Sequence, residues 1–347
     1  MLVHARYEVG ETLGRGAQGV ILRVVDREDR TRELVAKVVS ATSETASLEA
    51  EFALLSRLRI PGLARAHDWG RDTATKAPFF VEDFVDGPDA LTYLSPTQAP
   101  DELARRATKL IVGVATTLGA LHAAGFVHGD LKPAHVRVDT RGTFRLLDLG
   151  SAVLHGRSSR GATAKWAAPE VLAGGAVTPR ADLYSLGAIL RDVALPPSLE
   201  KIVAALTSRH PADRPESAYA VVGMLGRAAS TQLGAMPAPI GRDEALAFLL
   251  DAQGARVRAV VGPSGVGKSH LLREAFVRAL LAGDHARWIT AAVAPQLSAF
   301  LRGAKHAWPF TTPSTERTAL FVDDLERMPR ELTEALVAYV CRASDSP

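Results

Sequence analysis

The sequence predicts an α+β fold of two lobes, a small β lobe followed by a larger helical lobe, and then the first part of a separate α/β domain. Two observations predict the bilobal part. Apolar and polar residues alternate over the first 40 or so positions, whereas helical spacing dominates between residues 101 and 228. A third observation, a renewed strand–helix rhythm after residue 240, predicts the α/β domain.

The small lobe begins with three predicted strands in an antiparallel sheet. Their sequences are YEVGETLG (7–14), VILRVVD (20–26) and ELVAKVV (33–39). An amphipathic helix is predicted over 43–58, because apolar residues recur there at helical spacing and Pro61 follows its end. The segment FFVEDFV at 79–85 supplies another strand.

The helical lobe is predicted from Ala/Leu-rich patterns at 101–124, 181–193 and 215–228. The segment 229–239, ASTQLGAMPAP, has two prolines, few charges and no period, which favours a linker. We therefore expect a first domain at 1–228 and a second at 240–347. The second domain is predicted to contain a strand at 255–262, a helix at 271–283 and strands at 286–293 and 318–324.

Composition places the chain among soluble globular proteins. Hydrophobic residues make up 47% and charged residues 23%, and the formal charge of +3 comes from 41 basic against 38 acidic residues. Because this surplus is small and dispersed, we expect no nucleic-acid partner. A single cysteine, an N-terminal sequence unlike a signal peptide and no bilayer-spanning apolar run predict a cytoplasmic protein without membrane attachment.

A glycine-rich motif lies in the first predicted hairpin. Gly14, Gly16 and Gly19 with Val20 form G-x-G-x-x-G-x-V, in which missing side chains let backbone N–H groups close over nucleotide phosphates. By itself this motif is weak, since about half of such hairpins are only turns.

Lys37 lies on the third predicted strand, and Glu51 lies on the helix that follows. The Lys37 ammonium would reach the α- and β-phosphates of a nucleotide, and Glu51 would hold it by an ion pair. Taken alone, a lysine on a strand is better explained by surface solvation.

A third segment decides the interpretation. HGDLKPAH at 128–135 is followed by LDLG at 147–150 and by APE at 168–170. In this order, these segments resemble the catalytic loop, the metal-binding D-F-G motif and the A-P-E motif of protein kinases. The resemblance covers about residues 7–228. It implies the bilobal protein-kinase fold and a serine/threonine kinase of bacterial signalling type that uses ATP and Mg²⁺, with Mn²⁺ as an alternative.

The resemblance implies a role for each matching residue. Asp130 would accept or orient the proton of the substrate hydroxyl, Lys132 would steady the transferring phosphoryl group, and Asp148 would hold magnesium. Lys132 also indicates serine or threonine substrates. In the hinge-like segment FFVEDFVDG, Asp83 and Val85 are expected to bind the nucleotide.

Three further residues resemble structural positions of the family. Asp182 matches the helix residue that braces the catalytic loop, while Glu170 and Arg214 match the buried ion pair that ties the activation segment to the helical lobe. Gly129 replaces the arginine that binds an activation-loop phosphate in many kinases. We therefore do not expect activation by loop phosphorylation.

His135 departs from the pattern, because the family has asparagine there and magnesium prefers oxygen ligands to imidazole nitrogen. One alternative is that His135 only packs in the loop and a single magnesium on Asp148 suffices. The other is that His135 is a metal ligand with altered metal preference, or that catalysis is lost. Weakened or one-metal catalysis is favoured, because Lys37, Asp130 and Asp148 are all present.

The segment GPSGVGKS at 262–269 satisfies the phosphate-loop pattern G-x-x-x-x-G-K-S between a predicted strand and helix. Gly262 and Gly267 would let the backbone embrace phosphates, Lys268 would neutralise the β and γ groups, and Ser269 would bind magnesium. Asp323, in FVDD, would complete the metal shell. With the preceding IGRDEALAFLL, this region resembles AAA-like and STAND signalling ATPases.

The expected central strand of such an ATPase is missing, so the second domain is either cut short or a remnant that binds nucleotide poorly. We expect ATP and a Ser/Thr protein substrate as partners, and any oligomerisation to use the NTPase region. Two alternatives to kinase activity stay open. One is a pseudokinase scaffold that binds ATP without transferring phosphate, and the other makes the phosphate loop the main activity.

Overall fold

The computed structural model describes residues 6–16, 19–39, 45–95, 100–158, 161–227, 241–251, 258–262, 266–282, 285–289, 318–323 and 325–334. The predicted linker at 229–239 lies outside these residues. The chain divides into two compact units. One holds Met1–Thr45, His67–Glu82 and Ala238–Pro347, and the other holds Ala46–Ala66 and Asp83–Pro237. The domain boundaries expected from the sequence stay a prediction.

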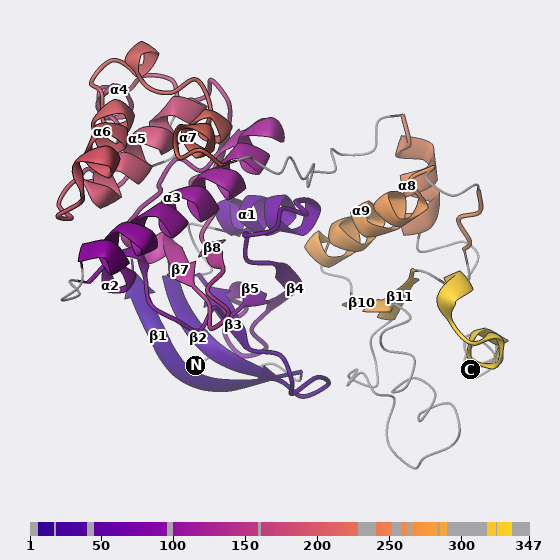
Figure 1. The fold of residues 1–347 in the computed structure, drawn as a ribbon. Helices are drawn as coiled ribbons and strands as arrows, with labels where there is room; N and C mark the ends of the chain where they lie inside the picture. The colour runs from indigo at the N-terminus through magenta and orange to yellow at the C-terminus, as the bar shows by residue number, and fades with distance from the viewer. Residues whose placement is uncertain are drawn as a thin grey trace. The chain divides into compact units, whose positions relative to one another are not determined.

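A five-stranded sheet opens the chain, with the strand order β1-β2-β3-β5-β4 (Figure 1). Its strands are β1 (Tyr7–Gly16), β2 (Gly19–Asp26), β3 (Leu34–Val38), β4 (Ala66–Arg71) and β5 (Pro78–Asp83). The antiparallel pairing of β1 with β2 and of β2 with β3 confirms the predicted three-strand sheet. Strand β4 was not predicted.

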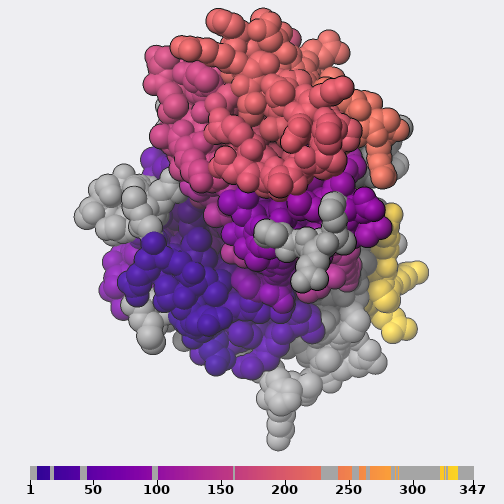
Figure 2. All heavy atoms as spheres, turned by 60° about the vertical axis from the view of Figure 1, so that its left-hand side comes forward, coloured from indigo at the N-terminus to yellow at the C-terminus, as the bar shows by residue number. Residues whose placement is uncertain are grey.

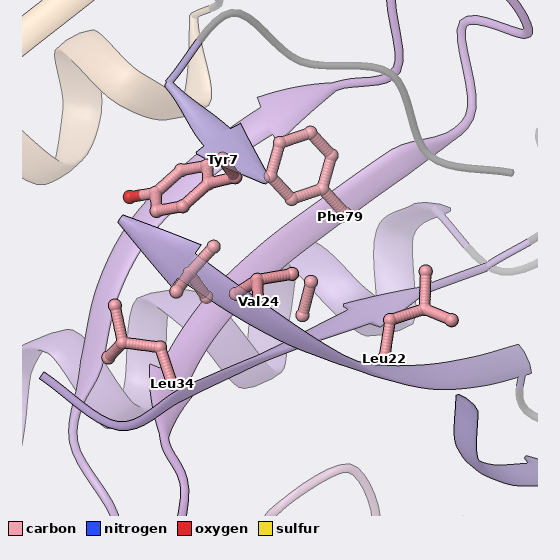
Figure 3. Packing of buried hydrophobic residues seen from close by; sticks show 7 residues of the cluster. Tyr7, Leu22, Val24, Leu34 and Phe79 are labelled. Atoms are coloured by element: carbon pink, nitrogen blue, oxygen red, sulfur yellow. The ribbon is translucent and has the colours of Figure 1, made fainter. Parts of the chain in front are cut away.

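The sheet buries one face through the alternation of its side chains. Leu22 and Val24 of β2 point to the same side, where they join Tyr7, Leu34 and Phe79 in one cluster (Figure 3). The rings of Tyr7 and Phe79 meet edge to face, with centroids 6.4 Å apart. The Tyr7 hydroxyl donates to Asp68 Oδ2 at 2.8 Å, which satisfies its polar end inside the core.

The next part of the chain consists mainly of helices and also contains two short antiparallel strand pairs (Figure 1). Its helices are α1 (Thr45–Arg57), α2 (Ala90–Tyr93), α3 (Pro100–Ala123), α4 (Pro169–Leu172), α5 (Pro179–Leu190), α6 (Pro197–Leu206) and α7 (Ala218–Met224). The ladders pair β6 (Phe126–Val127) with β9 (Val153–Leu154) and β7 (Val136–Val138) with β8 (Phe144–Leu146). Helix α6 was not predicted, and α7 is shorter than expected because Ser217 caps it by accepting from Ala220 N–H.

Close helix packing explains two glycines of this part. A Cβ on Gly119 of α3 would lie 2.6 Å from the Tyr219 ring of α7, and a Cβ on Gly187 of α5 would lie 2.6 Å from Leu206 of α6. The glycines therefore let these helix pairs approach closely. Figure 2 shows the later residues of this part, coloured pink to salmon, as one continuous mass of atoms.

The last part of the chain contains α8 (Asp243–Leu250), α9 (Lys268–Leu281), β10 (His285–Ile289) and β11 (Thr318–Val322). Strands β10 and β11 pair in parallel, which is the arrangement expected of an α/β domain. Phe276 of α9 packs edge to face on Trp288 and Phe321. The predicted strand at 255–262 is described only over 258–262, where it forms no ladder with the other described strands.

Across the part of the chain that the structure describes, no helix has both the length and the apolar character needed to cross a membrane.

Candidate functional site

One buried carboxylate of α5 fixes the backbone at the start of the catalytic-loop segment. Asp182 accepts hydrogen bonds from the His128 N–H at 2.8 Å and the Gly129 N–H at 3.0 Å, and His122 Nε2 lies 2.8 Å from its Oδ2. Burial by itself raises the pKa of Asp182, but these partners, His122 first, outweigh burial and hold the pKa below its usual value. The expected bracing of the loop by Asp182 is present.

Gly129 occupies a backbone conformation that favours glycine, with φ at 79°. A Cβ at this position would lie 2.8 Å from the Ser151 carbonyl oxygen. The arginine found at the corresponding position of many kinases would therefore strain this loop.

Asp130 belongs to a three-residue network with Lys132 and Thr163. The Lys132 ammonium donates to Asp130 Oδ2 at 2.7 Å and to the Thr163 hydroxyl at 3.2 Å. The Thr163 backbone N–H closes the network by donating to Asp130 Oδ1 at 2.7 Å. Both oxygens of the carboxylate are thus oriented, one by a charge and one by a backbone amide.

This network sets the protonation state of Asp130. Partial burial raises the pKa of its carboxyl, but the hydrogen bonds from Lys132 and Thr163 outweigh burial, so the pKa lies below the usual value. Asp130 is therefore ionised at neutral pH. A carboxylate with a low pKa is a weak base, so it is better suited to orient a hydroxyl than to remove its proton in the ground state.

His135 lies between the two aspartates of the site. Its Nδ1 is 2.9 Å from the Asp130 carbonyl oxygen, and its Nε2 is 3.3 Å from Asp148 Oδ2. Asp148 has φ at 61°, and its Oδ1 accepts from the Gly150 N–H at 3.1 Å. A backbone bond from Leu147 N–H to the His135 carbonyl, at 2.9 Å, joins the two loops.

Burial keeps the His135 imidazole neutral. It lowers the pKa of His135 to about 4, although the nearby Asp148 carboxylate acts in the opposite direction. The ring stacks on His128, with centroids 5.9 Å apart. Both ring nitrogens thus face oxygen atoms, and a metal-ligand role for His135 stays a prediction.

Glu51 of α1 lies close to the second loop. Its side chain is buried, and a Cβ on Gly150 would lie 3.2 Å from Glu51 Oε2 and 3.0 Å from Asp148 Oδ1. The glycine after Asp148 and Leu149 thus leaves room for two carboxylates. Within this unit the structure brings together Glu51, Asp130, Lys132, His135 and Asp148.

The glycine-rich motif forms the end of the β1–β2 hairpin, where Gly16 pairs with Gly19. Gly19 has φ at 125°, and a Cβ there would lie 2.2 Å from the Val38 carbonyl oxygen, so only glycine fits beside β3. Around Gly14 a Cβ would meet nothing within 4 Å, which leaves this position open. Val20 pairs with Val38 in the sheet.

The other residues that are expected to bind a nucleotide lie on β3 and at or just after the end of β5. Lys37 is buried on β3, and its ion pair with Glu51 stays a prediction. Asp83 ends β5, where its backbone and side chain both bond Arg65: Asp83 N–H donates to the Arg65 carbonyl, and Asp83 Oδ2 accepts from Arg65 N–H. Val85 follows and is partly buried. Nucleotide contacts of Asp83 and Val85 stay predictions.

The predicted phosphate loop leads into α9, whose first residue is Lys268. Gly267 precedes it with φ at 90°, and the Lys268 ammonium donates to the Gly262 carbonyl oxygen at 2.8 Å. The Ser269 hydroxyl donates to Asp323 Oδ1 at 2.8 Å. The structure thus brings Ser269 and Asp323 together across 54 residues of sequence. Residues 263–265 and 324 lie outside the described part.

The Arg214 guanidinium is fully buried and uses all its donors. It binds Glu170 through two bonds of 2.6 and 2.8 Å, which confirms the expected ion pair. Its other hydrogen bonds go to the carbonyl oxygens of Arg180, Ser208 and Arg209. A guanidinium buried with every N–H bonded avoids the penalty of an unsatisfied charge.

A sequence model described as the protein kinase domain matches residues 7–201 of this chain. The chain belongs to the protein kinase family. Its kinase domain contains the loops that hold Asp130 and Asp148 and the hairpin that carries the three glycines.

The similar curated proteins are bacterial serine/threonine kinases. A "Probable serine/threonine-protein kinase" of Streptomyces coelicolor is 28% identical over 61% of this chain and 34% of its own length. The "DNA damage-responsive serine/threonine-protein kinase RqkA" of Deinococcus radiodurans is 33% identical over 56% of this chain and 30% of its own. PknB of Mycobacterium tuberculosis is 28% identical over 54% of this chain and 32% of its own length. The chain thus spans about a third of the length of these relatives.

Sequence reasoning missed Thr163, which bonds both Asp130 and Lys132 of the kinase domain. Thr163 lies outside the motifs quoted for the family resemblance. A signal was available, because a hydroxyl residue stands five positions before the first residue of the A-P-E segment.

Protein kinases use ATP and a divalent cation in general, and the residues of this site fit such a cation. Asp148 Oδ2 and His135 Nε2 lie 3.3 Å apart and face each other. Among the described residues, no group of three or more His, Cys, Asp and Glu side chains is arranged to hold a metal. A cation here would therefore take its other ligands from phosphate oxygens and water.

Proposed function

We propose that this protein transfers the γ-phosphate of ATP to serine or threonine hydroxyls of a protein substrate in bacterial signalling. The observation that carries the proposal is the bonding of Asp130 to both Lys132 and Thr163, in a loop joined to the one that holds Asp148. Family membership and the names of the bacterial relatives support the same activity.

The residues of the site perform three tasks in this proposal. Asp130 orients the substrate hydroxyl, because its carboxylate is ionised and fixed by Lys132 and Thr163. Lys132, which is bonded to Asp130, stabilises negative charge on the transferring phosphoryl group. Asp148 and His135 hold the divalent cation, which would neutralise phosphate charge when bound.

Residues of the β lobe and the hinge are assigned to bind the rest of the nucleotide. Gly14, Gly16 and Gly19 offer backbone N–H groups to the phosphates, and Lys37, held by Glu51, neutralises the α- and β-phosphates. Asp83 and Val85 bind the adenine side. The buried position of Lys37 and the crowding at Gly19 support these assignments.

The test is transfer of labelled phosphate from ATP to the protein itself and to a basic protein. Asp130→Asn keeps the shape of the side chain and Lys37→Met removes the phosphate contact, so each is expected to lower the rate by at least about 100-fold. Asp192→Asn, a change at an exposed residue, is the matched control. Tight ATP binding without transfer in the wild-type protein would instead support the pseudokinase alternative.

We also propose that the region after residue 240 is a nucleotide-binding domain of the AAA/STAND-like class that regulates the kinase. The contact between Ser269 and Asp323, at the start of α9, supports this assignment. Calorimetric titration with an ATP analogue should find two sites in the wild type and one in Lys268→Ala. An unchanged stoichiometry would remove this assignment. Oligomerisation through this region and a cytoplasmic location stay predictions.

A further inference from the structure

Arg137 carries a positive charge on one face of the β7–β8 strand pair. Val136 and Val138 are buried, so the alternation of side chains places Arg137 on the opposite face of β7. Its cross-strand neighbour on that face is Arg145 of β8. Two like charges directly opposite each other weaken a strand pair, so an arginine at this position needs an offsetting interaction.

The two arginines differ in their partners. The Arg145 guanidinium has a carboxylate close by, since its Nε lies 3.5 Å from Asp139 Oδ2. The Arg137 guanidinium instead donates through Nη1 to the Gly87 carbonyl oxygen at 2.8 Å. Among the described residues, no carboxylate forms an ion pair with Arg137, although its side chain is partly buried. Because a guanidinium has five N–H donors and two flat faces, most of this group is left for a ligand.

The bond to Gly87 places the guanidinium beside the segment that is expected to bind the base. The backbone joins β7 to the same segment, because the Val138 N–H donates to the Pro88 carbonyl oxygen at 3.0 Å. Gly87 has φ at 148°, and a Cβ there would overlap the Val138 carbonyl oxygen, so this approach requires glycine. Strand β7 therefore lies against the chain two residues after Val85.

We propose that Arg137 binds the adenine base of the nucleotide, with the plane of its guanidinium stacked on the ring. A guanidinium is planar, and its charge is attracted to the face of an aromatic ring. The phosphates are assigned to the three glycines, Lys37 and Lys132, so the base is the part of the nucleotide that remains for this cation. The inference rests on the proposed function in that Asp83 and Val85 bind the adenine side.

The experiment is nuclear magnetic resonance of the full chain, labelled with ¹³C,¹⁵N-arginine and titrated with adenosine. Adenosine carries the base without phosphates, so it reports on the base alone. Protons held over the face of an aromatic ring are shielded, so we expect the Arg137 Hε and Hδ resonances to move upfield. They are identified as the resonances that Arg137→Lys removes. Titration with pyrophosphate should leave them in place, and no upfield shift at saturating adenosine would overturn the inference.

Calorimetry of variants gives a second measurement, made in Lys268→Ala protein to remove the other proposed nucleotide site. Arg137→Ala should weaken the binding of adenosine and of ATP equally, by about 5- to 30-fold, because the cation–π contact is lost. Arg137→Lys keeps the charge but not the plane and should recover only part of this loss. Arg141→Ala, at an exposed arginine between β7 and β8, should leave both affinities unchanged. A loss for ATP without one for adenosine would assign Arg137 to the phosphates and contradict the inference.

These outcomes are separate from those for the kinase activity. An upfield shift of the Arg137 resonances in a protein that transfers no phosphate would support the base contact and contradict the proposed function. Phosphate transfer by a protein whose Arg137 resonances do not respond to adenosine would do the reverse.

Discussion

Adding a methyl group at Gly129 should damage the kinase domain more than the same change at Gly142. Both glycines have a positive φ, 79° and 76°, so alanine at either position costs about 1–2 kcal/mol in backbone strain. At Gly142 a Cβ would meet nothing within 4 Å, whereas at Gly129 it would lie 2.8 Å from the Ser151 carbonyl oxygen. Overpacking of this kind adds about 1–3 kcal/mol. We therefore expect a loss of about 2–5 kcal/mol for Gly129→Ala.

The assay is urea denaturation followed by circular dichroism, with phosphate transfer measured on the same samples. Gly129→Ala should also slow transfer while still folded, because Gly129 precedes Asp130 and donates its N–H to Asp182. Gly142→Ala should transfer phosphate at the wild-type rate. Equal destabilisation by the two changes would refute the reasoning from the Ser151 contact.

Two further predictions concern the same loop. Thr163→Ala keeps the backbone N–H bond to Asp130 but removes the Thr163 hydroxyl, which accepts from Lys132 and also lowers the pKa of Asp130. The change should therefore lower the rate of transfer by about 10- to 100-fold and move the acidic limb of the pH–rate profile to higher pH. Thr163→Ser should restore both, and an unmoved acidic limb would contradict the assignment. Folding lowers the pKa of Asp182 from its usual value of 3.8. Its carboxylate therefore stabilises the fold fully above about pH 3.8, and this stabilisation is lost as the pH falls below that value. Asp182→Asn should cost about 2–4 kcal/mol of unfolding free energy at pH 7 and flatten the acid dependence, whereas parallel curves for variant and wild type would argue against this role.

The sequence allowed most of the strands and long helices to be predicted, because their apolar residues follow a clear period. Strand β4 (Ala66–Arg71) was missed, since AHDWGR contains charged residues and no alternation. Its Asp68 is buried because it accepts from the Tyr7 hydroxyl and the Arg6 guanidinium. Such a strand is stabilised by partners about 60 residues away, which no local pattern reveals.

The candidate site was predicted where its residues stand in contiguous motifs, as Asp130 and Asp148 do. Thr163 was missed because its role arises only when the chain returns to the loop 33 residues after Asp130. The sequence also showed that His135 was unusual but left open whether it only packs in the loop. The structure adds two distances from its ring nitrogens, because the orientation of a ring is not encoded in residue type.

The five donors of Arg214 connect segments that lie far apart in the chain, from Glu170 through Arg180 to Ser208 and Arg209. None of these segments can separate from the others without exposing a charge that is buried and bonded on all sides. Local fraying is therefore suppressed across this stretch, and its amides should open together as one cooperative unit. In hydrogen exchange, protected amides on α5 and α6 should share a single opening free energy.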